Sequence, residues 1–173
     1  GEVGEETGVD QVLLGEYKAY QYAVNASQKV RTYGASVAVN YYIYKGLSAY
    51  TNYTYSYIDT KDLTDPILPG YNTPRNKANI GIGGQRIVKG FGFNVNLKWV
   101  ESFWWESPFG DGKIPSFTTL DMNASYEFDK YITVQIGGSN ITNNKHIEAY
   151  GSPKIGGMVY ASLLFDLERN KKK

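Results

Sequence analysis

Residues 116–140 read SFTTLDMNASYEFDKYITVQIGGSN, two runs of alternating polar and apolar residues joined at Asp129-Lys130. Because successive side chains of a β-strand point to opposite faces, this alternation predicts a β-hairpin with one apolar and one polar row. In a soluble protein the apolar row would face a core, whereas in a membrane barrel it would face lipid. The direction of the alternation therefore decides the fold class. In the first run the apolar row is Leu120, Met122, Ala124, Tyr126 and Phe128.

The composition favours a β-rich protein and excludes several functions. The 173 residues include 16 Tyr, 19 Gly and 3 Trp, a mixture that suits strands and turns. A net charge of +1 provides no polybasic field for nucleic acid. The absence of Cys excludes disulfides and thiolate zinc sites, and a single His leaves little material for a Ser-His-Asp triad. No catalytic constellation stands out, so we expect neither an enzyme nor a bound cofactor.

The sequence contains no segment that would be read as a transmembrane helix or as a signal peptide. No run of eighteen apolar residues occurs, and the opening GEVGEETGVD lacks the charged and apolar regions of a signal peptide. We expect either that the mature chain begins here or that further sequence precedes it.

Period-two alternation recurs along most of the chain and predicts about eight antiparallel strands. In residues 91–99 the odd positions are apolar and the even positions are polar or Gly. The predicted strands are long, and a tilted strand needs only about 9–11 residues to span a membrane. They cover residues 32–44, 47–59, 76–87, 91–104, 116–128, 131–141 and 154–167, with a weaker first strand within 9–24.

The predicted connections alternate between tight turns, at 45–46, 88–90 and 129–130, and long loops, at 60–75, 105–115 and 142–153. Antiparallel strands place alternate connections at opposite ends, so this is the asymmetry of outer-membrane barrels. Aromatic residues also flank the aliphatic positions, as lipid interfaces select. They are Tyr41, Phe91, Phe93, Tyr126, Phe128, Tyr131 and Phe165 toward the tight turns, and Trp99, Phe103, Trp104, Trp105 and Phe117 toward the long loops.

Four stretches carry a resemblance to a known family. They are Pro74-Arg75 after a long loop, TTLDMNASYEF at 118–128, GGSNITNNKHIEAYGSP at 137–153 and the closing VYASLLFDL at 159–167. Together they resemble the C-terminal strands of TonB-dependent outer-membrane receptors. The resemblance spans nearly the whole chain and implies an all-β, antiparallel transmembrane barrel whose polar rows line a hydrated lumen. It also implies that one long strand runs from about Tyr20 to Ile43.

Receptors of this family resemble barrels of about 22 strands with a plugged lumen, which do not fit in 173 residues. We therefore expect residues 1–173 to be the C-terminal portion of such a barrel, without the plug and the earlier strands, and 168–173 to be a polar tail. The resemblance implies TonB-dependent import of a nutrient, such as an iron chelate, a vitamin or a glycan or peptide fragment, across a Gram-negative outer membrane. The implied partners are outer-membrane lipid, the remaining strands and plug, the TonB system and the nutrient, with no nucleic acid.

Two other interpretations remain open from the residues alone. Eight strands could close on themselves into a narrow outer-membrane barrel with a structural or adhesion role, because its interior would be filled by side chains. Alternatively, the apolar rows could face inward in a soluble, lipocalin-like binder.

The loop FWWESPFGDG at 103–112 is the best candidate for ligand contact, through Trp104, Trp105, Phe109 and Asp111. We add Tyr71 and His146, which lie in the other two predicted external loops. The alternative for the aromatic residues is an anchor at the membrane interface, and the alternative for His146 is a solvated loop residue. We predict no metal site, because the three-residue spacing of Asp59, Asp62 and Asp65 does not match an EF-hand loop.

Overall fold

The computed structural model describes residues 29–61, 70–107 and 110–166. Regular structure within these ranges consists of nine strands. Their bounds are β1 (Arg31–Tyr44), β2 (Leu47–Asp59), β3 (Asn76–Val88), β4 (Phe91–Val100), β5 (Phe103–Ser107), β6 (Gly110–Ile114), β7 (Phe117–Glu127), β8 (Ile132–Ser139) and β9 (Met158–Phe165). No helix in the described part of the chain is long and apolar enough to cross a membrane.

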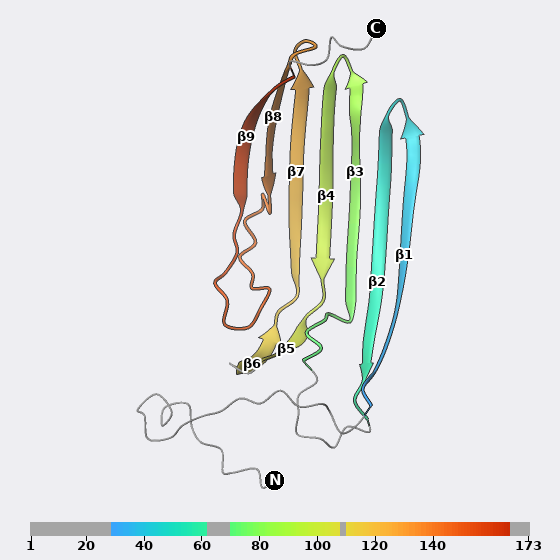
Figure 1. Cartoon of the computed structure of the whole chain (residues 1–173), viewed down its shortest axis with the longest axis vertical. Helices are drawn as coiled ribbons and strands as arrows, with labels where there is room; N and C mark the ends of the chain where they lie inside the picture. The colour runs from blue at the N-terminus through green and yellow to red at the C-terminus, as the bar shows by residue number, and fades with distance from the viewer. Residues whose placement is uncertain (1–28, 62–69, 108–109, 167–173) are drawn as a thin grey trace, which may run out of the picture.

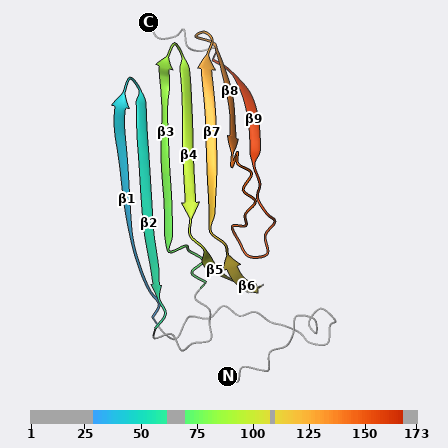
Figure 2. The ribbon, with the colours of Figure 1, turned by 180° about the vertical axis from the view of Figure 1, so that it is seen from behind.

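Seven strands form one antiparallel sheet in the order β1-β2-β3-β4-β7-β8-β9, and β5 pairs only with β6 (Figures 1 and 2). The three tight turns lie at one end of this sheet and the long connections at the other, as the sequence predicts (Figure 1). In the described residues β1 and β9 stand at opposite edges and do not pair. The described strands therefore form an open sheet and do not close into a barrel among themselves.

The strand register keeps the polar and apolar rows separate across the whole sheet. In β4, Asn94 lies opposite Gly83 of β3 and Asn123 of β7. The next residue, Val95, lies opposite Ile82 and Met122. Because directly opposite residues share a face, the period-two pattern of each strand continues through its neighbours. One face of the sheet is consequently polar and the other apolar.

The apolar face is not covered by protein in the described structure. Ile80 is 58% exposed, Ile136 is 59% exposed and Val159 is 81% exposed. The buried hydrophobic residues among the described positions are only Val100, Ile114 and Phe117. A soluble binder with inward apolar rows would bury these side chains in a core, so the structure contradicts that alternative.

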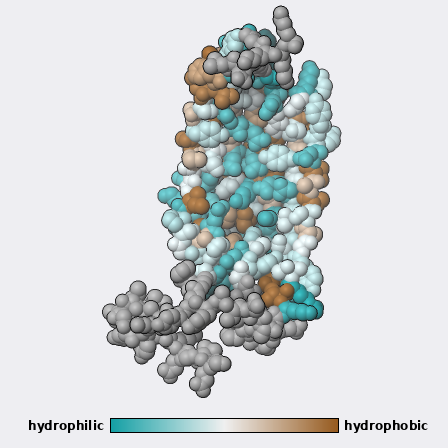
Figure 3. Space-filling view, viewed as in Figure 1, coloured by the Kyte–Doolittle hydropathy of each residue, from teal (hydrophilic) through white to brown (hydrophobic). Residues whose placement is uncertain are grey.

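The polar face is hollowed. Side chains from β2 to β9 line a cavity of about 720 Å³, including Ser48, Asn94, Ser125 and Gln135. Figure 3, viewed as Figure 1, shows hydrophilic residues gathered along the middle of this face. The Tyr50 ring lies over Gly81, where a Cβ atom would approach it to 2.3 Å, so a larger residue at this position would displace the ring. The polar rows thus line the hollow side of the sheet, as the resemblance implies.

Several predicted boundaries differ from the structure. The predicted loop 105–115 is wrong, because most of it forms the β5–β6 hairpin, and the predicted strand 91–104 ends at Val100. Residues 101–102 separate β4 from β5, where the Glu101 amide donates to the Asn76 carbonyl (3.0 Å). The predicted strand 131–141 ends at Ser139 because Asn140 adopts a left-handed φ of 48°.

The last predicted strand, 154–167, starts later than expected, at Met158, and is described as far as Phe165. Gly156 and Gly157 precede it, and glycine weakens a strand. The predicted strand within 9–24, the start of the long strand from Tyr20 and the tail 168–173 lie outside the described residues.

Candidate functional site

Three segments meet at the end of the sheet that carries the long connections (Figure 1). They are residues 70–75, the β5–β6 hairpin and residues 140–157, which we call the loop platform. The first contact joins residues 70–75 to β5. The Asn72 side-chain Nδ2 donates to the Glu106 carbonyl (2.8 Å), and the Asn72 Oδ1 accepts from the Glu106 backbone amide (2.7 Å). The Gly70 amide donates to the Glu106 carboxylate (3.1 Å). Glu106 therefore connects residues 70–75 to the β5–β6 hairpin.

The β5–β6 hairpin has two different faces. On one face Trp105 lies opposite Gly112, and the Tyr150 ring packs there so closely that a Cβ atom at Gly112 would lie 2.1 Å from it. On the other face Trp104 lies opposite Lys113 and Glu106 lies opposite Asp111. Trp104 is 54% exposed. Residues 140–157 therefore pack on the Trp105 face of the hairpin through Tyr150. Trp104 and its charged neighbours lie on the opposite face.

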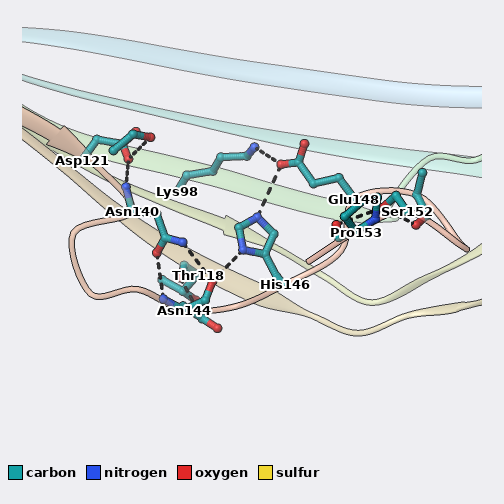
Figure 4. Close-up of polar contacts among 11 residues, drawn as sticks. Lys98, Thr118, Asp121, Asn140, Asn144, His146, Glu148, Ser152 and Pro153 are labelled. Carbon is teal, nitrogen blue, oxygen red and sulfur yellow. Dashed lines mark hydrogen bonds and ion pairs between the residues drawn. The ribbon is translucent and has the colours of Figure 1, made fainter. Parts of the chain in front are cut away.

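The His146 side chain lies between Asn144 and Glu148 in the loop platform (Figure 4). Only 7% of its side chain is exposed, and its ring stacks on Phe117 with centroids 4.1 Å apart. Its Nδ1 lies 2.8 Å from the Asn144 carbonyl, and its Nε2 lies 3.7 Å from a Glu148 carboxylate oxygen. The Lys98 Nζ donates to the same oxygen of Glu148 (3.3 Å). This cluster joins the inner row of β4 to the loop.

Asn140 organises the start of the same loop. Its side chain donates to the Asn144 carbonyl (2.9 Å) and accepts from the Asn144 amide (3.0 Å). Its own amide donates to the Asp121 carboxylate of β7 (2.7 Å), which also accepts from the Ser139 hydroxyl (3.0 Å). Asn144 in turn donates to the Thr118 carbonyl (3.0 Å). Side chains therefore connect the start of the loop to β7, and Asn140 itself is 4% exposed.

Arg75 precedes β3 at the same end of the sheet. Its guanidinium donates to the Tyr55 hydroxyl (3.2 Å from Nη2) and lies 5.2 Å from the centroid of the Tyr57 ring. The hydrogen bond with Tyr55 raises the pKa of Arg75 above its ordinary value. Arginine is charged at any physiological pH, so the guanidinium contributes a cation beside the platform.

The structure places the predicted site residues in different surroundings. Trp104 and Asp111 share the exposed face of the hairpin, whereas Trp105 belongs to the packed face. Tyr71 is half-buried in the 70–75 segment next to Asn72. His146 is enclosed by Phe117, and Phe109 lies outside the described residues.

Phe117 is wrongly predicted as part of the outer aromatic band. Phe117 is 5% exposed and lies opposite Val100, on the inner row. The Lys98 Nζ lies 5.4 Å from the centroid of the Phe117 ring. Sequence reasoning also missed Asn72, Glu106 and Tyr150, because their contacts join segments 34 or more residues apart or depend on a hairpin that was taken for a loop. Alternation alone carried a signal for Phe117, since it is an odd position in a strand whose outward residues are even.

No group of three or more His, Asp or Glu side chains in the described ranges is placed to hold a metal ion. The polar residues of the platform are instead engaged with one another and with backbone groups. The buried polar side-chain atoms of the described residues all have hydrogen-bond partners. The exposed face of the hairpin combines the Trp104 indole ring with the Asp111 carboxylate and the Lys113 amine.

Comparison with models of known protein families assigns the chain to one of them. Residues 4–141 match the family model described as TonB dependent receptor-like, beta-barrel. The chain belongs to this family. It is a family of outer-membrane β-barrel receptors and not a class of enzymes. A search of curated proteins finds no match.

Two solved structures share this fold. One is P. aeruginosa FpvA bound to a heterologous pyoverdine with iron, with a TM-score of 0.58, 13% identity, and coverage of 79% of this chain and 20% of that chain. The other is the FpvAI complex with pyocin S2, with a TM-score of 0.59, 13% identity, and coverage of 79% and 19%. At this identity the likeness shows the fold alone. The chain spans about a fifth of the length of these receptors.

Proposed function

We propose that this chain forms the C-terminal portion of the barrel of an outer-membrane importer whose plug and earlier strands lie outside residues 1–173. In this proposal the receptor takes up a nutrient in a TonB-dependent manner, and the chain contributes wall, lumen surface and external loops. The observation that carries it is the two-faced open sheet, with an exposed apolar side and a hollow polar side. A barrel wall between lipid and a hydrated lumen needs this division.

In the same proposal the exposed hairpin face, with Trp104 and Asp111, contacts the ligand outside the cell. An indole ring can stack on a flat or cyclic ligand, and neighbouring charges can orient it. The FpvA complex contains pyoverdine and iron, which makes ferric chelates the first ligand class to test. The platform contacts through Asn72, Glu106 and Tyr150 would hold this face in place.

The orientation can be tested with single cysteines in the full-length receptor, because residues 1–173 contain none and any elsewhere can be replaced first. Lys113→Cys lies on the platform, and Lys89→Cys lies in the turn between β3 and β4 at the other end of the sheet. A membrane-impermeant maleimide added to intact cells is expected to label only Lys113→Cys, with Lys89→Cys labelled after lysis. The reverse pattern would place the platform in the periplasm and contradict the proposal.

Uptake can be tested with ferric catecholate and hydroxamate chelates carrying radioactive iron, in cells with and without the gene and with and without TonB. Uptake that needs both genes is expected for at least one chelate. Trp104→Ala should weaken chelate binding by about tenfold, equivalent to about 1.4 kcal/mol, whereas Trp104→Phe keeps a ring and should retain most of it. A Trp104→Ala protein that binds normally but unfolds more easily from lipid would instead identify Trp104 as an interface anchor.

A further inference from the structure

The polar side chains of the polar face have different partners in its two halves. From Asn96 toward the platform they bond to one another across the strands. The Tyr50 hydroxyl of β2 donates to the Asn96 Oδ1 of β4 (3.2 Å), and the Asn79 Nδ2 of β3 donates to the Asn52 Oδ1 of β2 (2.9 Å). The sheet itself therefore supplies hydrogen-bond partners in this half.

Nearer the tight turns, the polar face carries side chains without such partners. Five neighbouring side chains that line the hollow of about 720 Å³ form no hydrogen bond with any other described residue. We call these five residues the open polar cluster. They are Asn94, Asn123, Ser125, Thr133 and Gln135. Amides and hydroxyls both donate and accept hydrogen bonds, so the cluster can bind groups of either kind.

The strand register places the open polar cluster in one patch. Asn94 of β4 lies directly opposite Asn123 of β7, and Ser125 of β7 lies directly opposite Gln135 of β8. Thr133 is on the same face of β8, two residues before Gln135. Neighbouring strands are about 4.8 Å apart, and residues on one face of a strand repeat at about 6.8 Å. A single bound segment can therefore reach several members of the cluster.

Glycines keep the cluster accessible. Gly83 lies opposite Asn94, and a Cβ atom at Gly83 would approach the Asn94 Nδ2 to 2.7 Å. Gly92 lies opposite Ser125, and a Cβ atom at Gly92 would approach the Ser125 Oγ to 2.9 Å. A larger residue at either position would press against these polar atoms. The two glycines therefore leave room for another molecule to come close to the cluster.

The charges around the hollow balance each other. Arg86 and Glu127 are the two charged residues among the described residues that line it, and the Arg86 Nε lies 3.0 Å from both carboxylate oxygens of Glu127. The β3–β4 register shifts between Gly84 and Val88, and within this irregularity Arg86 has a left-handed φ of 53°. Such irregularities re-aim side chains, and here the Arg86 side chain reaches Glu127, two strands away. The hollow therefore favours a neutral occupant.

We propose that the open polar cluster is a docking site for a segment of the plug, which it holds through the backbone N–H and C=O groups of that segment. The proposal rests on the proposed function, which supplies the plug, and it adds where on this wall the plug docks and through which groups. A polypeptide backbone is neutral and carries one donor and one acceptor at nearly every residue. Side-chain amides and hydroxyls above a glycine floor match that pattern.

A nutrient in transit fits the hollow less well. A charged chelate would meet no charge here that Arg86 and Glu127 do not already balance. The plug belongs to the same polypeptide as the wall, so its effective concentration at the cluster is about millimolar whatever the nutrient supply. Residues 1–173 span about a fifth of the solved receptors with this fold, so ample polypeptide lies outside them. Because water can replace hydrogen bonds of this kind at small net cost, the docking is also reversible.

The first experiment locates the occupant by photo-crosslinking in intact cells that express the full-length receptor. Gln135→p-benzoylphenylalanine places the crosslinker in the cluster. The control Val134→p-benzoylphenylalanine places it on the adjacent outward position of β8, opposite Tyr126 and Leu163. Mass spectrometry of the crosslinked peptides is expected to join position 135 to the plug of the same polypeptide. Position 134 should give no crosslink to the plug.

The second experiment measures hydrogen exchange of the crosslinked plug segment in the full-length receptor. The double variant Asn94→Leu, Asn123→Leu keeps the side-chain size and removes the amides. Exchange of the segment should rise by at least about tenfold, since each lost hydrogen bond contributes about fivefold. The control Asn79→Leu, Asn96→Leu changes the same residue type where the partners lie within the sheet, and should leave the exchange of the segment unchanged. Alanine substitutions along the segment should also have little effect, because its backbone makes the contact. Circular dichroism of each variant confirms that it is folded.

Four results would overturn the docking site and leave the proposed function standing. Position 135 could crosslink only to another protein or to nothing. Exchange of the segment could stay the same in the Asn94→Leu, Asn123→Leu variant, or could depend on the side chains of the segment. That variant could also lose binding of a ferric chelate while the plug is unaffected, which would assign the hollow to the nutrient. A crosslink to the plug from position 134 instead of position 135 would reverse the two faces of the wall and contradict the proposed function, so the two failures can be told apart.

Discussion

The seven-stranded sheet and the loop platform are stabilised in different ways. In the sheet, the same backbone ladder and the same two rows repeat from β1 to β9, so we expect that exchanging one inner polar residue for another has a small effect. In the platform, a few side chains each make contacts that no neighbour duplicates, such as Asn140 on Asn144 and Tyr150 on Gly112. The sheet should therefore be sensitive to which face a residue occupies, and the platform to which residue it is.

The largest expected effect tests the two faces at one depth. Val95→Arg places a charge on the outward row between Ile82 and Met122, whereas Asn94→Arg places the same charge on the inner row opposite Gly83. Val95→Arg should lower the free energy of unfolding from lipid vesicles by roughly 2–4 kcal/mol, because the guanidinium would lie in hydrocarbon. Asn94→Arg should cost less than about 1 kcal/mol, since Gly83 leaves room and the hollow is polar.

The measurement is equilibrium unfolding of the full-length protein by denaturant in the presence of vesicles. If Asn94→Arg is the more damaging of the pair, the assignment of the lumen and lipid faces is reversed. Because the two positions are adjacent in β4, differences in depth cannot produce the expected contrast.

The contrast between the regions also explains what sequence could predict. The strands β2, β3 and β7 each lie within one residue of their predicted bounds. In β7 a period-two pattern runs from Thr119 to Glu127, whereas in β3 it is limited to residues 77–82 and in β2 the two faces are less distinct. The inward direction of the Asn94 row followed from aromatic bands, loop lengths and family resemblance together. The structure confirms it with the exposed apolar row and the polar hollow.

The platform could not be predicted in the same way. Its β5–β6 hairpin has five residues in each strand, too few for the alternation to stand out, and it includes two adjacent tryptophans on opposite faces. The contacts that enclose His146 join β4, β7 and a loop near residue 148, so no local pattern indicates them. The sequence indicated the aromatic residue types at this end but not which of them pack and which remain exposed.

Asn140 provides a test of intermediate size. It is 4% exposed, and its side chain is bonded to both the amide and the carbonyl of Asn144. Asn140→Ala should lower the free energy of local opening of residues 140–157 by about 1–3 kcal/mol, because the amide and the carbonyl of Asn144 both lose their hydrogen-bond partner. Hydrogen exchange of the loop amides measures this opening.

The backbone conformation of Asn140 requires a separate control. Its φ of 48° also disfavours alanine, so part of the effect of Asn140→Ala could be strain. Asn140→Gly accepts that φ and removes the same side-chain bonds. We expect Asn140→Gly to open the loop nearly as much as Asn140→Ala. Near-normal protection in the glycine variant would show that the conformation, not the hydrogen bonds, makes this residue necessary.

The ion pair between Lys98 and Glu148 should have the smallest effect. Their side chains are 41% and 49% exposed, and pairs in such surroundings contribute about 0.2–1 kcal/mol. Glu148→Gln should therefore increase loop exchange only slightly, and the difference should shrink in high salt. Phe117→Ala removes the ring that His146 stacks on and should open the loop much more, because it leaves a cavity. If Glu148→Gln opened the loop as widely as Asn140→Ala, charge and not packing would hold the platform to the sheet.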